Sequence, residues 1–166
     1  MQQRQLGLLQ NTRPLRQPVS IVGPRDATET QLACARRLGT LLAEAKVPVL
    51  CGGKGGVMEA ASCGVQQSGG IVIGLLPEDD DQEANHHLTV ALPTGMGISR
   101  NALIARACTL MVAIGGGLGT MSEMALALQW TKPVFSIHHA PEVPGHRAFE
   151  TEEAMHLALF IALLEI

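Results

Sequence analysis

The sequence is poor in aromatic and charged residues. Only three of its 166 residues are phenylalanine and one is tryptophan, and tyrosine is absent. Charged residues make up 16% of the chain, whereas 46% of it is hydrophobic. The core must therefore be built from aliphatic side chains and methionine. Because so few charges leave little polar surface to cover a monomer, we expect a homo-oligomer.

Other absences exclude whole classes of partner. The net charge is −3 and no run of Lys or Arg occurs, which argues against nucleic acid, because phosphate backbones require clustered cations. We find neither an 18-residue apolar stretch nor a secretory signal peptide, so we expect no membrane association and a cytoplasmic location. No CxxC pair occurs, and four separate apolar runs predict reduced, buried thiols at Cys34, Cys51, Cys63 and Cys108.

Strand-like and helix-like patterns alternate along the chain. Short apolar runs predict strands at 18–23, 47–51, 71–76, 88–92, 109–114 and 132–137. Amphipathic patterns and capping residues predict helices at 28–45, from about 57 to 67, at 97–107, at 121–130, and from Thr151 onward. This alternation predicts one Rossmann-like, doubly wound α/β domain over 17–166, with a mostly parallel sheet of about six to seven strands and helices on both faces. Residues 1–16 are expected to form a loosely ordered extension, and 138–148 a loop.

A glycine-rich turn is the strongest functional signal. The segment Gly115-Gly116-Gly117-Leu118-Gly119-Thr120 follows a predicted buried strand and precedes a predicted helix. Glycines allow positive φ and let backbone N–H groups approach an anion, while the helix N-terminus adds partial positive charge. Thr120 adds a hydroxyl donor. We therefore predict that the turn binds a phosphate-bearing small molecule.

A second glycine-rich stretch, Gly52-Gly53-Lys54-Gly55-Gly56, also follows a predicted strand. It lacks the GxxxxGK[ST] spacing of an ATP-binding P-loop, and no Ser or Thr follows Lys54 to hold magnesium. We expect an auxiliary anion contact from its backbone. The first strand ends in Gly-Pro instead of GxGxxG, so no NAD site is predicted.

Two charged residues near the main turn have alternative interpretations. Thr120-x-x-Glu123 has capping-box spacing, so Glu123 either caps its helix or assists cleavage of an N-glycosidic bond in a bound nucleotide. Arg100 follows a Gly-Met-Gly segment and either binds a phosphate or carboxylate of the ligand or forms a surface salt bridge.

No dedicated metal site is predicted. The acidic run 79–81 and the histidine pair 86–87 lack the spacing of metal ligands and are interpreted as solvated loop, as is the pair 138–139. No serine lies in a nucleophile elbow.

Three segments together resemble a known family. They are CGGKGGVMEAASCGVQQSGGIVIGLLP, LPTGMGISRNALIARA and VAIGGGLGTMSEMALALQWTKPVF. The chain resembles the LOG-like (SLOG) nucleotide-binding superfamily over about residues 19–135, and within it the branch of molybdenum cofactor carrier proteins. The resemblance implies a dimer or tetramer that binds the molybdenum cofactor, a phosphorylated pterin, and delivers it to molybdoenzymes. The ligand would be held by Gly52, Gly53, Lys54, Gly55, Arg100, Asn101, Gly115, Gly116, Gly117, Gly119 and Thr120.

A sister branch implies a different activity. It contains phosphoribohydrolases that release the base from a nucleoside monophosphate and share a motif of the form PGGxGTxxE. Arg100 and Glu123 match its catalytic arginine and final acid. Gly115 replaces its proline, however, and Ser122 replaces the first of its two acids, which favours a carrier over a hydrolase. A nucleotide-sensing module is a third possibility.

Overall fold

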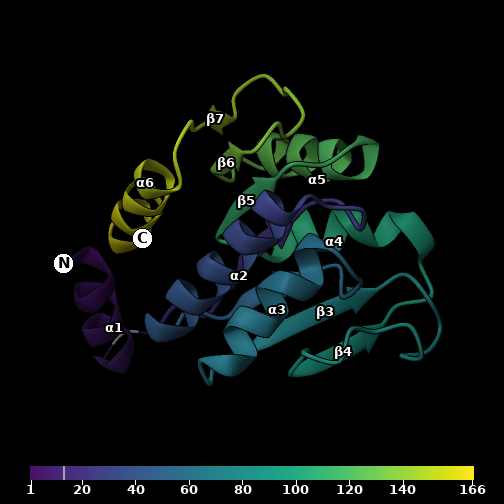
Figure 1. The fold of residues 1–166 in the computed structure, drawn as a ribbon, viewed down its shortest axis with the longest axis horizontal. Coiled ribbons are helices and arrows are strands. Elements are labelled where there is room, and N and C mark those ends of the chain that lie inside the picture. Colours follow the sequence, from purple (N-terminus) through teal and green to yellow (C-terminus); the bar gives the residue numbers. More distant parts are fainter. Residues whose placement is uncertain (13) are drawn as a thin grey trace.

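The computed structural model describes residues 1–12 and 14–166. Within these residues, seven strands form one sheet in which every pairing is parallel, in the order β4-β3-β2-β1-β5-β6-β7. The predicted α/β class and mostly parallel sheet are confirmed (Figure 1). The strands are β1 Val19–Val22, β2 Val49–Cys51, β3 Val72–Leu76, β4 Val90–Pro93, β5 Leu110–Ile114, β6 Val134–Ile137 and β7 Arg147–Ala148.

Helices cover both faces of the sheet, as the sequence predicted. The helices are α1 Gln2–Thr12, α2 Glu29–Glu44, α3 Val57–Gln67, α4 Asn101–Ala107, α5 Leu118–Gln129 and α6 Glu152–Leu164, with a 3-10 turn, η1, at Gly97–Arg100. One hydrophobic cluster joins α2, α3 and α6 to one face, and a second joins α4 and α5 to the other. The central strands β1 and β5 are buried along their whole length, which explains their continuous apolar runs.

The predicted helix caps form at α2 and α6. The Thr28 hydroxyl accepts a hydrogen bond from the Gln31 amide, and the Gln31 side chain accepts one from the Thr28 amide. This reciprocal pair satisfies two donors at the start of α2. The Thr151 hydroxyl caps α6 by accepting a single hydrogen bond from the Ala154 amide.

Three segments differ from the sequence prediction. Residues 2–12 form α1, where a loosely ordered extension was expected, because Leu6 is buried in the hydrophobic core and Gln10 bonds the Lys46 carbonyl. Figure 1 shows α1 beside α6 at one end of the molecule. Arg147 and Ala148 lie in the predicted loop but pair with β6 as a short edge strand. α5 begins three residues earlier than predicted, which changes the role of Thr120.

The order of the strands creates one reversal point. The chain moves outward from β1 through β2, β3 and β4, then returns to the other side of β1 and continues through β5, β6 and β7. Parallel α/β sheets bind ligands outside the carboxyl ends of the strands at such a reversal. The glycine turn that follows β5 lies at this position.

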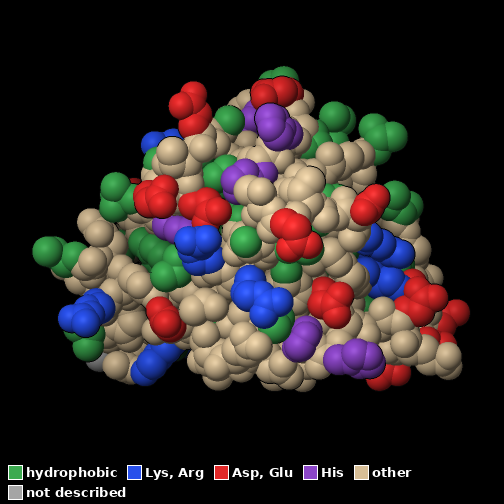
Figure 2. All heavy atoms as spheres, viewed as in Figure 1, with side chains coloured by type: hydrophobic (Ala, Val, Ile, Leu, Met, Phe, Trp, Pro, Cys, Tyr) green, Lys and Arg blue, Asp and Glu red, His purple; other side chains and the backbone are tan. Residues whose placement is uncertain are grey.

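Charge is mixed on the face shown in Figure 2. Lys and Arg side chains are interspersed there with Asp and Glu, and no broad basic area covers that face. Among the described residues, no helix has the length and apolar character needed to cross a membrane.

Candidate functional site

The turn after β5 has two kinds of glycine. Gly115 and Gly116 have φ values of 63° and 128°, which L side chains rarely adopt. A Cβ on Gly115 would overlap the Gln31 side chain, and one on Gly116 would overlap Thr120. Backbone conformation and packing therefore account for both residues without a ligand.

Gly117 and Gly119 have no such explanation. Neither has a positive φ, and a Cβ added to either would meet no atom within 4 Å. Gly117 is the N-cap of α5 without a side-chain cap, so the first amides of the helix lack intrahelical acceptors. The missing side chains leave space in front of amides that are oriented to receive an acceptor.

A cavity of about 370 Å³ lies against this turn. It is bounded by the end of β1, the start of α3, η1 with α4, and the first turn of α5. The sequence-predicted residues that line it are Arg100, Asn101, Gly117, Gly119, Thr120 and Glu123. The structure thus brings together the main turn, the predicted cation and the predicted acid.

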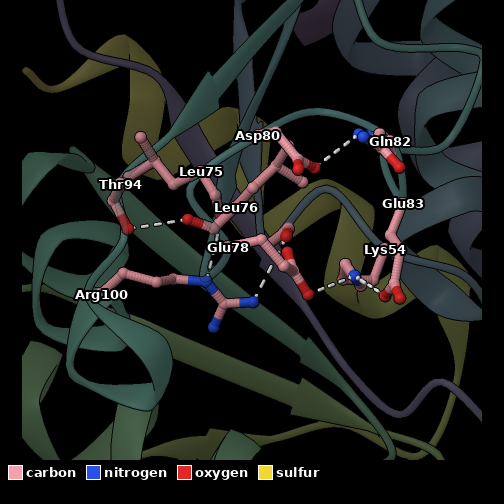
Figure 3. Close-up of polar contacts among 10 residues, drawn as sticks. Lys54, Leu75, Leu76, Glu78, Asp80, Gln82, Glu83, Thr94 and Arg100 are labelled. Atoms are coloured by element: carbon pink, nitrogen blue, oxygen red, sulfur yellow. Dashed lines mark hydrogen bonds and ion pairs between the residues drawn. The ribbon is translucent and has the colours of Figure 1, made fainter.

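Arg100 is buried, with 8% of its surface exposed, so the alternative of a surface salt bridge is wrong. Its Nε donates to the Leu75 carbonyl at 2.8 Å (Figure 3). Its Nη2 donates to the Gly52 carbonyl at 3.3 Å. Its Nη1 donates to Asn101 Oδ1. Burial lowers the pKa of Arg100, and nearby Glu123 opposes that shift. Arginine stays charged in proteins, so the cavity contains a fixed cation with a defined orientation.

Glu123 does not cap its helix, which corrects the capping-box interpretation. Because α5 begins at Leu118, Thr120 and Glu123 both lie inside it, and neither side chain forms a cap. Glu123 is 7% exposed, and burial raises the pKa of its carboxyl to about 8, with the Arg100 charge opposing the rise. At neutral pH the carboxyl is therefore mostly protonated.

Asn101 lies between Arg100 and α5. Besides accepting from Arg100, its Nδ2 donates to Ser122 Oγ at 3.2 Å. Ser122 Oγ in turn donates to the Gly119 carbonyl at 2.7 Å. This chain of hydrogen bonds links the cation to the glycine turn.

The second glycine stretch does not line the cavity. The Lys54 ammonium lies 2.6 Å from Glu78 Oε1 and 2.6 Å from Glu83 Oε2, between the two carboxylates (Figure 3). Gly52 lies behind Arg100, where a Cβ would overlap the guanidinium, and Gly53 lies against Leu76. Lys54 therefore anchors the acidic loop 77–85, while Gly52, Gly53 and Gly55 remain outside the cavity wall.

Sequence reasoning missed several residues of the cavity wall. The turn after β1 contributes three consecutive residues, and the others come from three further segments. The Gly-Pro break after the first strand was the available signal, because it marks a strand end at the reversal point. The missed residues are Gly23, Pro24, Arg25, Met58, Pro77 and Ile98.

Comparison with known proteins shows the family of this chain. The model of the SLOG cluster4 family matches residues 16–161. The molybdenum cofactor binding protein of Rippkaea orientalis has a similar structure, with a TM-score of 0.80, 32% identity, and coverage of 89% of this chain and 98% of that one. The molybdenum cofactor carrier protein of Chlamydomonas reinhardtii has a TM-score of 0.81 at 30% identity, with 90% and 99% covered.

An enzyme also shows similarity. The cytokinin riboside 5'-monophosphate phosphoribohydrolase of Rhodococcoides fascians is 31% identical over 111 residues. The match covers 64% of this chain and 55% of that protein, so it spans about half of the enzyme's length.

Proposed function

This chain belongs to the SLOG cluster4 family, and we propose that it binds the molybdenum cofactor, a phosphorylated pterin, and carries it without transforming it. The similarity to two molybdenum cofactor proteins over nearly their whole length supports this ligand. In this proposal the protein delivers the cofactor to molybdoenzymes in the cytoplasm.

The open glycines are the observation that carries the proposal. Packing does not require glycine at Gly117 or Gly119, because a Cβ on either would meet no atom within 4 Å. Both residues line the cavity that contains Arg100. The free amides of the first turn of α5 bind the terminal phosphate, helped by the helix dipole. The Thr120 hydroxyl adds a donor. The cavity of about 370 Å³ falls within the range of small-molecule sites, about 300–1,000 Å³.

The charges of the cavity favour an anion. Arg25 and Arg100 both line it, whereas Glu123 is mostly neutral below its pKa of about 8. A protonated Glu123 does not neutralise these cations and acts as a hydrogen-bond donor instead of repelling phosphate. Asn101 keeps Arg100 in place for the ligand.

One observation favours a second candidate, a nucleoside 5'-monophosphate phosphoribohydrolase. A buried acid with a raised pKa beside a phosphate cradle is typical of a general acid. Glu123 would protonate the leaving base, and Arg100 would orient the nucleotide. The similarity to the Rhodococcoides enzyme supports this candidate, but Ser122 stands where the motif of the phosphoribohydrolase branch commonly has an acid.

The two functions predict opposite results in one assay. The protein is incubated with AMP and with other nucleoside monophosphates, and free base and ribose 5-phosphate are measured. A carrier gives no turnover but binds molybdenum cofactor saturably. Binding is measured under anaerobic conditions as the amount of pterin that stays with the protein. Robust turnover that disappears in Glu123→Ala would contradict the carrier function and support the hydrolase.

A glycine substitution tests the phosphate cradle directly. Gly119→Ala places a methyl group in open space within α5, so it should leave the fold intact or stabilise it by about 0.5–1 kcal/mol. The same methyl group would occupy the phosphate position, so cofactor affinity should fall about tenfold or more, which corresponds to about 1.4 kcal/mol.

The matched control is Gly7→Ala in α1. A Cβ on Gly7 makes only ordinary contacts, and the residue lies far from the cavity wall in the sequence and the fold. This variant should gain similar helix stability with unchanged affinity. Equal affinity of Gly119→Ala and the wild type would remove the turn from the binding site.

A further inference from the structure

Three potential metal ligands converge away from the cavity. Cys34 lies on α2, His138 directly follows β6, and Glu152 is the first residue of α6. The ligand atoms of these side chains all lie within 4.8 Å of one another. None of the three lines the cavity beside the glycine turn. The tertiary fold thus gathers a thiol, an imidazole and a carboxylate from distant parts of the sequence.

One of these side chains has a buried polar atom without a hydrogen-bond partner. Among the described residues, His138 Nε2 has none, whereas Glu152 Oε2 is paired with Arg37 Nε at 3.0 Å. His138 Nε2 lies 3.6 Å from Glu152 Oε1, which is longer than a hydrogen bond. Leaving the His138 nitrogen unsatisfied is costly, and a metal ion bound to it would remove that cost. The sequence context of His138 predicted a solvated loop, but only 22% of its side chain is exposed.

The backbone holds the imidazole in place. His138 has a φ of 56°, a left-handed conformation that is uncommon for a residue other than glycine. The Gln31 side chain donates a hydrogen bond of 3.2 Å to its carbonyl. Backbone conformations of this kind persist where surrounding structure enforces them, and they cluster at functional sites.

We propose that Cys34, His138 and Glu152 bind one divalent transition-metal ion of the zinc type. Thiolate, imidazole and carboxylate are the ligands that zinc takes in proteins, and three of them leave a fourth tetrahedral position for water. Binding forms a metal–sulfur bond as the Cys34 thiol loses its proton to solvent.

The surroundings permit such a site. Arg37 Nε lies 3.0 Å from Glu152 Oε2, but its side chain is 60% exposed, so the guanidinium has room to move into water. The bound ion would tie α2, the segment after β6 and α6 together. Gln31, which holds His138, also packs against Gly115, so the ion would brace the segment beside the glycine turn.

Cobalt(II) is the probe for this site, because a cobalt–thiolate bond gives a charge-transfer absorption band in the near ultraviolet. We expect titration of the reduced, full chain to produce this band and to saturate at one ion per chain. Cys34→Ala should abolish the band, and Glu152→Gln should weaken Co²⁺ binding at least tenfold. Co²⁺ should also raise the melting temperature of the wild type but not of Cys34→Ala.

Cys63→Ala is the matched control, since Cys63 is a buried thiol on α3 outside the cluster. It should keep the band. Circular dichroism checks that each variant is folded. If Cys34→Ala does not fold, the loss of Co²⁺ affinity in Glu152→Gln provides the test. Absence of the band from the wild type, or its persistence in Cys34→Ala, would overturn the proposal.

Discussion

Glu123 shows how burial changes the meaning of a residue. Its spacing from Thr120 fits a helix cap, yet both residues lie inside α5 and face the cavity. Desolvation raises the pKa of the Glu123 carboxyl to about 8, against an ordinary value of 4.5. The same burial that makes the residue neutral at pH 7 makes its ionisation a cost to the fold.

We predict that this cost appears in the pH dependence of stability. Between pH 4.5 and about 8 the unfolded chain releases the Glu123 proton while the folded chain keeps it, so rising pH favours unfolding. Glu123→Gln removes this contribution. The variant should therefore gain stability relative to the wild type between about pH 5 and pH 9, on the order of 4 kcal/mol.

Urea unfolding midpoints of both proteins across this pH range provide the measurement. Glu59→Gln is the control, because Glu59 is an exposed acid on the neighbouring α3. A difference between Glu123→Gln and the wild type that stays constant with pH would show that Glu123 titrates normally.

At the scale of elements, one buried lysine contacts the acidic loop 77–85 at several points. The buried Lys54 ammonium contacts Glu78 and Glu83, and Asn85 donates to the Lys54 carbonyl at 3.1 Å. The Lys54 contact lowers the pKa of the Glu78 carboxyl. Pro77 at the start of this loop lines the cavity. The loop is therefore anchored at Glu78 and Glu83, and its first residue forms part of the cavity wall, while the acidic run 79–81 is exposed to solvent as predicted.

Lys54→Met should release this loop. Amide hydrogen exchange over 77–85 should accelerate, and the free energy of unfolding should fall by about 1–3 kcal/mol, because two carboxylates lose their shared cation. Lys46→Met is the control for lost charge, since Lys46 is exposed and its ammonium donates to the exposed Asn11 side chain. Unchanged exchange in Lys54→Met would mean that other contacts hold the loop.

At the scale of the whole molecule, apolar surface remains uncovered. Leu118 and Met121 on α5 are 83% and 38% exposed, and Ala125 continues the same outward stripe. On α6, Leu157 and Ile161 form a second exposed pair. A chain with few charges is expected to cover such surface by association.

We predict a homo-oligomer whose contact includes the outward stripe of α5. Light scattering at micromolar concentration should give a multiple of the 17.5 kDa chain mass, and Met121→Glu should reduce it. Leu157→Glu is the comparison, placed on α6. A monomeric wild type would contradict the association. If only Leu157→Glu dissociates the oligomer, the contact lies on α6 and not on α5.

The local pattern of the sequence was enough to predict the class of fold. Buried parallel strands require continuous apolar runs, and helix caps require particular residues at fixed spacing, so both signals lie within a few residues of each other. The glycine turn after β5 was predictable for the same reason. The helix at 2–12 was not, because it depends on the burial of Leu6 against distant residues.

The composition of the site was decided only by the tertiary structure. Sequence reasoning weighted the glycines around Lys54 as ligand contacts, but the lysine reaches the acidic loop, and the turn after β1 supplies Arg25 to the cavity instead. It also assigned no metal site, because Cys34, His138 and Glu152 are separated by more than any motif spans. Strand order and crossover direction determine which loops meet, and these depend on long-range packing rather than local spacing. The sequence by itself thus determined the parallel α/β framework and the glycine turn after β5, whereas the fold decided which side chains surround that turn.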